Sequence, residues 1–302
     1  MALNNPAFNN PAFQDSRAVQ SYPGGANAAN LGGATSTAQR AGTDAAAQAH
    51  LEGMYAAPPA GSTDTGRMTV EDTVAKTVGL FAILLVGAVA GWLWTMSPVT
   101  AQNPVPTALP MIIGGLVGFV LSLVVIFTSR KKVRPGLIFA YAAAEGLFVG
   151  GISAFFEFIY PGIVTQATLG TLVVVGVTLA LFASGKIRAS KRATKIFLIA
   201  MVGYLVFSLV NVGLMLFGVT DSAFGLRSEV TIFGIPLGVI IGLLVVIMAA
   251  YSLVLDFDQI QQGVRNGAPR QMGWLGGFGI MVTVVWLYVE ILRIIAIVRG
   301  GE

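Results

Sequence analysis

The sequence predicts an all-α membrane protein with seven transmembrane helices. Of its 302 residues, 55% are hydrophobic and only 11% are charged, whereas a soluble domain carries roughly 25% charged residues. The apolar residues after position 75 form seven continuous stretches. As a helix rising 1.5 Å per residue, each stretch is long enough to cross about 30 Å of hydrocarbon. Continuous apolar character, without short alternating segments, argues against a transmembrane β-barrel.

The seven stretches define a transmembrane domain at residues 76–298. The expected spans are Thr77–Thr95, Thr107–Thr128, Gly136–Glu157, Ile163–Ser184, Lys195–Phe217, Thr231–Asp256 and Trp274–Val298. Glycines recur four residues apart, a spacing that lets helix backbones approach closely. These pairs are Gly87 and Gly91, Gly114 and Gly118, Gly146 and Gly150, and Gly234 and Gly238.

Residues 1–70, the N-terminal segment, differ in composition and are rich in Asn, Ala, Gly, Ser, Thr and Pro. They open with a tandem repeat of Asn-Asn-Pro-Ala-Phe at residues 4–8 and 9–13, read either as a docking motif or as part of a flexible tail. Few branched apolar residues are present to offset the entropy cost of ordering, so we expect disorder. The segment does not have the pattern of a secretory signal, so the first span is expected to direct insertion.

Basic residues predict the orientation in the membrane. They gather in the loops after the second, fourth and sixth spans, whereas the loop after the fifth span has only Arg227. The positive-inside rule therefore places the N-terminus in the cytoplasm of a multi-pass cell-membrane protein. With seven spans, the C-terminus is expected outside; if the seventh span re-enters instead of crossing, the C-terminus lies in the cytoplasm. The basic loops account for the pI near 9.5 and do not indicate nucleic-acid binding.

Several kinds of chemistry are excluded by residue type. The chain has no cysteine, and its single histidine, His50, lies in the N-terminal segment. The spans therefore offer no thiolate, no imidazole base and no Cys or His metal ligand. Protease, hydrolase and phosphate-binding motifs are also missing from the sequence. We expect neither an enzyme nor a bound cofactor.

Acidic residues in or beside the spans are the candidate functional residues. A carboxylate in the bilayer centre costs about 2.5–3.5 kcal/mol, and such residues usually mark a path for ions or protons. Glu145, in the middle of the third span, is either part of an ion path or a structural acid bonded to a neighbouring helix. Glu157, at the end of that span, is as readily an interfacial anchor or a residue that orients the loop.

The last two spans carry the acids that matter most. Asp256 and Asp258 point about 200° apart on a helix, so only one can face the interior; alternatively, both are interfacial. Glu290 lies well inside the seventh span, and Arg293 three residues later makes an intrahelical ion pair the alternative interpretation. If Glu290 met the inward aspartate, the two would share a proton and, once deprotonated, offer oxygen ligands to Ca²⁺. Arg130, at the inner end of the second span, would be placed to hold one of them.

Residues 76–298 resemble the Bax inhibitor (YccA-like) family, also called the transmembrane Bax inhibitor motif proteins. Two segments carry the resemblance most specifically: Leu-Asp-Phe-Asp-Gln-Ile at 255–260 and Trp-Leu-Tyr-Val-Glu-Ile-Leu-Arg-Ile at 286–294. Phe-Thr-Ser-Arg-Lys-Lys-Val-Arg-Pro-Gly at 127–136, with Tyr141 and Ala-Glu-Gly-Leu at 144–147, adds to them. The N-terminal segment lies outside this resemblance.

The resemblance implies six helices around a central seventh and a pH-sensitive Ca²⁺ leak. It assigns Asp256 and Glu290 as the acid pair and Arg130 as the latch of the closed form. The chain departs from the family pattern in having Glu290 where Asp is usual, and in the extra acid Asp258. The expected function is thus a pH-sensitive calcium leak channel or exchanger. The alternative is a membrane-embedded regulator that binds a protein partner, for instance a protease or a stress-pathway component, through its N-terminal segment.

Overall fold

Seven long helices form the computed structural model, which describes residues 66–220, 222 and 224–300. All seven are long and apolar enough to cross a membrane, which confirms the predicted all-α fold. They are α5 (Val70–Met96), α6 (Leu109–Ser129), α7 (Pro135–Ile159), α8 (Ile163–Ala183), α9 (Lys191–Leu216), α11 (Leu237–Arg265) and α12 (Met272–Gly300). A short helix and two short strands join α9 to α11: α10 (Leu226–Glu229), β1 (Thr231–Ile232) and β2 (Ile235–Pro236).

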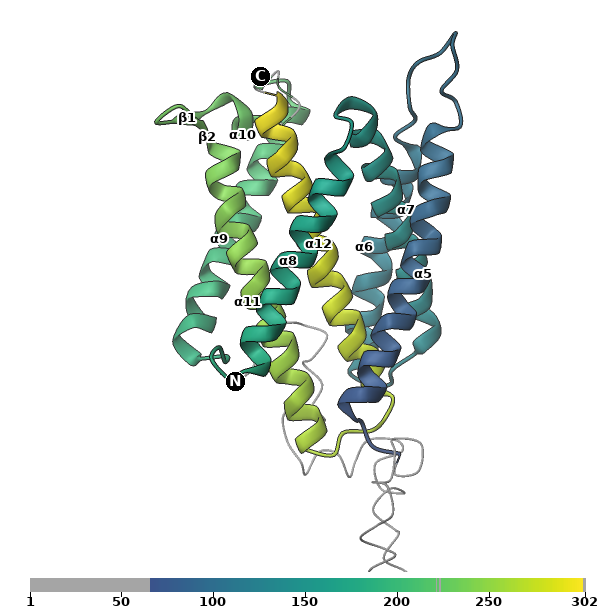
Figure 1. The fold of residues 1–302 in the computed structure, drawn as a ribbon, viewed down its shortest axis with the longest axis vertical. Helices are drawn as coiled ribbons and strands as arrows, with labels where there is room; N and C mark the ends of the chain where they lie inside the picture. The colour runs from purple at the N-terminus through teal and green to yellow at the C-terminus, as the bar shows by residue number, and fades with distance from the viewer. Residues whose placement is uncertain (1–65, 221, 223, 301–302) are drawn as a thin grey trace, which may run out of the picture.

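The last helix, α12, lies at the centre of the bundle, as the resemblance implied. It packs against α5, α7, α8 and α11, and Figure 1 shows it in yellow, crossing the bundle diagonally. Its side chains dominate the core, where Leu275, Phe278, Met281, Leu287 and Leu292 are all buried. Helix α6 packs mainly on α7, and α9 lies beside α11. The acids of α11 and α12 therefore lie on the helix pair that includes the central helix.

The sixth span begins later than predicted. Residues 231–236 were expected to be helical, but they form a β-hairpin in which Ile232 pairs with Ile235. Phe233 and Gly234 both have positive φ, at 54° and 78°, as a two-residue type I′ turn requires. Helix α11 starts only at Leu237 and continues to Arg265. Asp256 thus lies nine residues before the end of its helix, about 13 Å inside it, rather than at the end.

The first span begins earlier than predicted. Helix α5 starts at Val70, where the Thr69 side chain accepts a hydrogen bond from the Asp72 amide at 3.2 Å, a normal N-cap. Just before it, the Met68 amide donates to the Ala268 carbonyl at 2.7 Å and the Arg270 amide donates to the Gly66 carbonyl at 2.9 Å. The end of the N-terminal segment is therefore attached to the α11–α12 loop. Disorder was predicted for residues 1–70, of which residues 1–65 lie outside the described residues, while Gly66, Met68 and Thr69 make these contacts and Val70 begins α5.

Glycines make the contact between α5 and α7 very close, as their spacing predicted. A Cβ added at Gly150 would lie 1.9 Å from the Ala88 carbonyl oxygen, and one at Gly146 would lie 2.2 Å from that of Leu84. These two backbones touch only because neither glycine has a side chain. Gly234 differs, because it lies in the hairpin turn with nothing within 4 Å of its Cβ position. The predicted pairing of Gly234 with Gly238 in helix packing is thus wrong.

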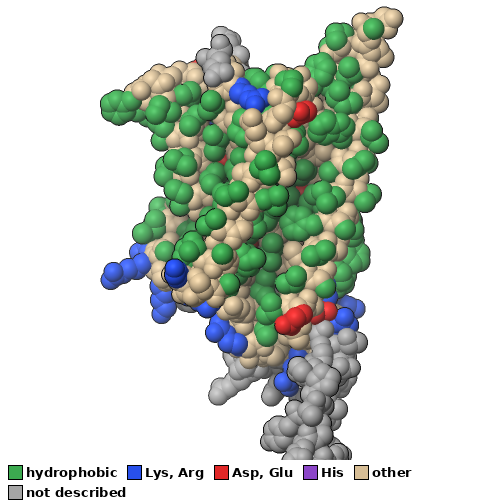
Figure 2. Space-filling model, in the orientation of Figure 1, with side chains coloured by type: hydrophobic (Ala, Val, Ile, Leu, Met, Phe, Trp, Pro, Cys, Tyr) green, Lys and Arg blue, Asp and Glu red, His purple; other side chains and the backbone are tan. Residues whose placement is uncertain are grey.

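The outer surface is divided into an apolar band and a basic end. In Figure 2, hydrophobic side chains cover the middle of the molecule, and Lys and Arg side chains gather at one end. That end carries the α6–α7, α8–α9 and α11–α12 loops, which hold the basic residues that predicted orientation. The opposite end carries the α5–α6 loop, α10 and the hairpin (Figure 1).

Candidate functional site

Glu290 is buried inside the bundle and is held by an arginine of its own helix. Only 1% of its surface is exposed. Its Oε2 accepts hydrogen bonds from Arg293 Nη1 at 2.6 Å and from the Tyr204 hydroxyl of α9 at 2.9 Å. Arg293 Nη1 also donates to the Tyr204 hydroxyl at 3.0 Å. The intrahelical ion pair, which was the alternative interpretation of this residue, is therefore present.

A second arginine reaches Glu290 from the loop between α9 and α11. Arg227 of α10 is 5% exposed, and its Nη1 lies 3.9 Å from Glu290 Oε1. Its Nη2 donates to Ser208 Oγ at 2.9 Å, and its guanidinium carbon lies 5.3 Å from the centre of the Tyr204 ring. We call Tyr204, Arg227, Glu290 and Arg293 the Arg227 cluster. It combines one formal negative charge with two positive charges.

Asn211 of α9 places α10, and with it Arg227. Its Oδ1 accepts a hydrogen bond from the Leu226 amide at 2.8 Å, and its Nδ2 donates to the Phe224 carbonyl at 3.1 Å. From the sequence, Arg227 was expected to be an ordinary basic residue of a loop, so its contact with Glu290 was not predicted. The one available signal was that it is the only basic residue in the loop after the fifth span.

Asp256 lies in a different environment from Glu290. It is completely buried, and its Oδ2 accepts a hydrogen bond from Thr283 Oγ1 of α12 at 2.7 Å. Ser252 Oγ lies 3.4 Å from the same threonine oxygen. We call Ser252, Asp256 and Thr283 the Asp256 site. Asp258 is only half-buried and accepts from Gln262 Nε2 at 2.8 Å, so it is Asp256 that faces the interior.

The two acids do not form the direct pair that was expected. Thr283, the partner of Asp256, precedes Glu290 by seven residues, which corresponds to about 10 Å along α12. Opposite Glu290, α11 instead presents Gly242, whose Cβ position lies 3.5 Å from Glu290 Oε1. The relative position of α11 and α12 along their axes therefore sets the acids at different depths. Among the described residues, no group of three acidic or histidine side chains is close enough to hold a metal ion.

Arg130 does not contact Asp256 in this conformation. It is exposed at the C-cap of α6, a helix that packs on α7 and α5, whereas Asp256 is fully enclosed near α12. The latch that the resemblance implied is therefore not formed here. Glu290 is reached instead by Arg293 of its own helix and by Arg227, which lies at the other end of the bundle from Arg130.

The two acids of α7 make local contacts. Glu145 is half-buried, is hydrogen-bonded to Tyr141 and lies against Gly118 of α6, with Oε2 2.9 Å from that glycine's Cβ position. Glu157 accepts hydrogen bonds from the Gly162 amide at 2.6 Å and the Val164 amide at 3.0 Å. It thus satisfies free amides at the start of α8, which is the loop-orienting role proposed as an alternative.

A further charged cluster at the basic end was not predicted. Lys76 of α5 is buried, forms an ion pair with Asp72 and donates to the Arg270 carbonyl at 2.6 Å. Arg270 Nη2 in turn lies 3.0 Å from Asp72 Oδ1. From the sequence, the basic residues of this loop were expected only to set the orientation in the membrane. The structure adds a mechanical role, because these contacts fasten the start of α5 to the α11–α12 loop.

Comparison with known proteins identifies the family. A family model described as Bax inhibitor 1 like matches residues 5–300. The chain belongs to this family. The match confirms the resemblance based on the motifs of the late helices, and with the seven apolar helices it makes this a multi-pass membrane protein. The N-terminal segment was expected to lie outside the family resemblance. That expectation is wrong, because the matched region includes most of this segment. No curated protein and no solved structure matches the chain.

The buried acids of this Bax inhibitor 1 like protein thus form two chemically different places. The Asp256 site combines carboxylate and hydroxyl oxygens, the kind of ligand atom that Ca²⁺ prefers. The Arg227 cluster has an excess of positive charge in a region of low dielectric, where it repels other cations strongly.

Proposed function

We propose that the protein is a proton-regulated calcium leak channel. The observation that carries the proposal is the fully buried carboxylate of Asp256, which lies beside the hydroxyl of Thr283 on the central helix. A carboxylate in this position is costly to bury, and such residues usually mark a functional site. Its oxygens suit Ca²⁺, and protonation removes the charge that attracts the ion. Resemblance to the Bax inhibitor family supports the same activity.

The proposal assigns the two acids separate tasks instead of a shared proton. Asp256 attracts the ion, and Glu290 holds the Arg227 cluster together. Opening requires the positive charge of Arg227 to move away from the ion path, which means that α10 must shift from its place against Asn211. The basic loops support an orientation with the N-terminus in the cytoplasm of a cell membrane, so α10 would then lie on the opposite side.

Calcium flux into vesicles tests the role of Asp256. The purified chain is reconstituted with a calcium-sensitive dye inside, and uptake is measured over a range of pH. We expect Asp256→Asn to lower the uptake about tenfold at neutral pH, since loss of about 1.4 kcal/mol of attraction changes a rate by that factor. It should also flatten the pH dependence, because the titrating group is gone.

The matched control is Asp258→Asn, which makes the same chemical change two residues away, where the half-buried carboxylate accepts a hydrogen bond from the neutral Gln262 amide. Its uptake should stay within about twofold of the unchanged protein. Equal uptake by the unchanged protein and Asp256→Asn would show that Asp256 is structural, and the proposed mechanism would then fail.

The second candidate function is a membrane regulator that acts by binding a protein. It is favoured by the contact between residues 66–68 and the α11–α12 loop, which links the N-terminal segment to the helices that carry the buried acids. A shortened chain starting at Gly66 keeps these contacts and separates the two functions. A leak channel retains calcium uptake after the shortening. If neither the full nor the shortened chain passes Ca²⁺, the regulator is the better explanation.

A further inference from the structure

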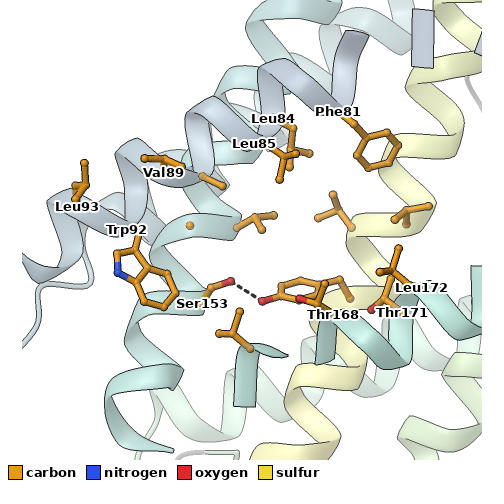
Figure 3. A pocket seen from close by; sticks show the side chains of 17 residues that line it. Phe81, Leu84, Leu85, Val89, Trp92, Leu93, Ser153, Thr168, Thr171 and Leu172 are labelled. Atoms are coloured by element: carbon orange, nitrogen blue, oxygen red, sulfur yellow. Dashed lines mark hydrogen bonds between the residues drawn. The ribbon is translucent and has the colours of Figure 1, made fainter. Parts of the chain in front are cut away.

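An apolar groove runs between α5 and α8, with α7 and α12 as its floor. Its volume is about 770 Å³, within the range of cavities that bind small molecules. Figure 3 shows Phe81, Leu85 and Val89 of α5 on one side and Thr168 and Leu172 of α8 on the other. None of the described residues that line it is charged. It is separate from both the Asp256 site and the Arg227 cluster.

The groove opens sideways onto the surface that faces lipid. Its rim includes Leu85, Val89 and Leu93 of α5 and Leu172 of α8, each more than 60% exposed. Helix α5 packs mainly on α7 and α12, while α8 packs mainly on α12 and α11. The two helices thus flank the groove without packing extensively against each other.

The length of the groove corresponds to one leaflet of a bilayer. Along α5 it extends from Phe81 to Leu93, twelve residues or about 18 Å, compared with about 15 Å for half of a 30 Å hydrocarbon core. Trp92 lies near its end, four residues before α5 ends at Met96, a place typical of a tryptophan at the membrane interface.

Three of the four hydroxyl groups that line the groove, those of Ser153, Thr171 and Tyr288, are bonded to the protein itself. Ser153 Oγ and the Tyr288 hydroxyl lie 2.6 Å apart (Figure 3), and Thr171 Oγ1 donates to the Ala167 carbonyl at 2.7 Å. With these groups satisfied, the lining offers an apolar surface without a charged partner for a headgroup. Empty apolar space of this size would forfeit dispersion contacts along its whole length.

We propose that this groove binds one acyl chain of a phospholipid from the leaflet at the α5–α6 loop end. The bound chain fills the space between α5 and α8 and contacts Tyr288, two residues before Glu290. The chain thereby completes the packing of the bundle in the space that separates α5 from α8. Recognition is of the hydrocarbon chain, while the headgroup stays at the interface near Trp92.

Photolabelling in vesicles tests the proposal. The purified full chain is reconstituted in phosphatidylcholine that contains a small fraction of lipid with a photoreactive group at the end of one acyl chain. We expect adducts on the groove residues of α5 and α8 to saturate with dose. They should exceed, by at least about fivefold, adducts on the exposed face of α9 around Leu205 and Leu209. Even, unsaturable labelling of all lipid-facing helices would show annular lipid only and overturn the site.

Two substitutions that fill the groove have matched controls on the same helix. Thr168→Phe places a ring in the groove, whereas its control Thr165→Phe changes a residue about one turn earlier on α8 that is also exposed but does not line the groove. Leu172→Trp and Leu169→Trp form a second pair, with both leucines about 60% exposed and only Leu172 lining the groove.

Labelling of the groove residues should fall at least about fivefold in Thr168→Phe and Leu172→Trp and stay unchanged in the two controls. Thermal unfolding of each variant in detergent confirms that it is folded, and the leucine pair carries the test if Thr168→Phe is not. Equal labelling in variants and controls would contradict the proposal.

Discussion

Glu290→Gln is expected to lower the free energy of unfolding by about 3 kcal/mol, because removal of one partner from a buried ion pair leaves an uncompensated charge. In this protein it leaves two positive charges without their carboxylate partner, those of Arg227 and Arg293. Arg227 is almost fully buried and 3.9 Å from the Glu290 carboxylate, and Arg293 donates to the same carboxylate at 2.6 Å. Thermal unfolding of the purified protein in detergent measures the loss as a lower midpoint. Asp258→Asn is the control, since its half-buried carboxylate accepts its hydrogen bond from a neutral amide.

A double substitution separates the charge effect from lost packing. In Glu290→Gln with Arg227→Gln, one buried positive charge is removed together with the negative one. The combined loss should then be smaller than the sum of the single losses by about 0.5–3 kcal/mol, the range for residues that interact directly. Additive losses would mean that Arg227 and Glu290 do not stabilise one another, and that the residues of the Arg227 cluster contribute to stability independently.

Gly150→Leu should prevent normal packing of α7 against α5. Overpacking a core usually costs about 1–3 kcal/mol, but here the contact is between backbones. The new Cβ would lie 1.9 Å from the Ala88 carbonyl oxygen and 2.6 Å from the carbonyl carbon, so neither side can yield by changing a rotamer. The helices would have to separate along the most extensive contact in the bundle. We expect most of the protein to be lost as aggregate in size-exclusion chromatography.

Gly176→Leu is the matched control for this effect. Gly176 lies in α8 with nothing within 4 Å of its Cβ position, and leucine has a higher helix propensity than glycine by roughly 0.7–1 kcal/mol. This variant should elute as a single peak and unfold at or above the midpoint of the unchanged protein. If Gly150→Leu behaved in the same way, the close approach of α5 and α7 would not be required for folding.

Hydropathy was sufficient to predict the seven helices, but it was not sufficient to place all of their ends. Residues 231–236 are apolar enough to extend the sixth span, so hydropathy does not distinguish their hairpin from a helical turn. The turn of the hairpin places Phe233 and Gly234 at positive φ. The sequence did not signal this turn, because Phe-Gly is not the Asn-Gly or Asp-Gly pair that usually occupies it. Helix α11 also continues nine residues past Asp256, to Arg265, which is why Asp256 lies deeper in its helix than counting suggested.

Asp256 and Glu290 show a similar limit of sequence-based prediction within the candidate site. Their helical spacing correctly predicted that only one of Asp256 and Asp258 would face the interior, and that Arg293 could reach Glu290. It could not predict the level at which α11 and α12 meet, because sliding one helix by a single turn moves its side chains about 5.4 Å without changing its hydropathy. Direct pairing of Asp256 with Glu290 depended on that level.

The sequence by itself determined a seven-helix membrane protein with costly acids in its last two spans, because hydrocarbon requires each spanning backbone to satisfy its own hydrogen bonds. Only the tertiary structure decided which charges meet. Arg227 precedes Glu290 by 63 positions, and Asp72 and Arg270 are 198 residues apart. Contacts over such separations arise from the packing of whole helices, which the residue types along any one helix do not specify.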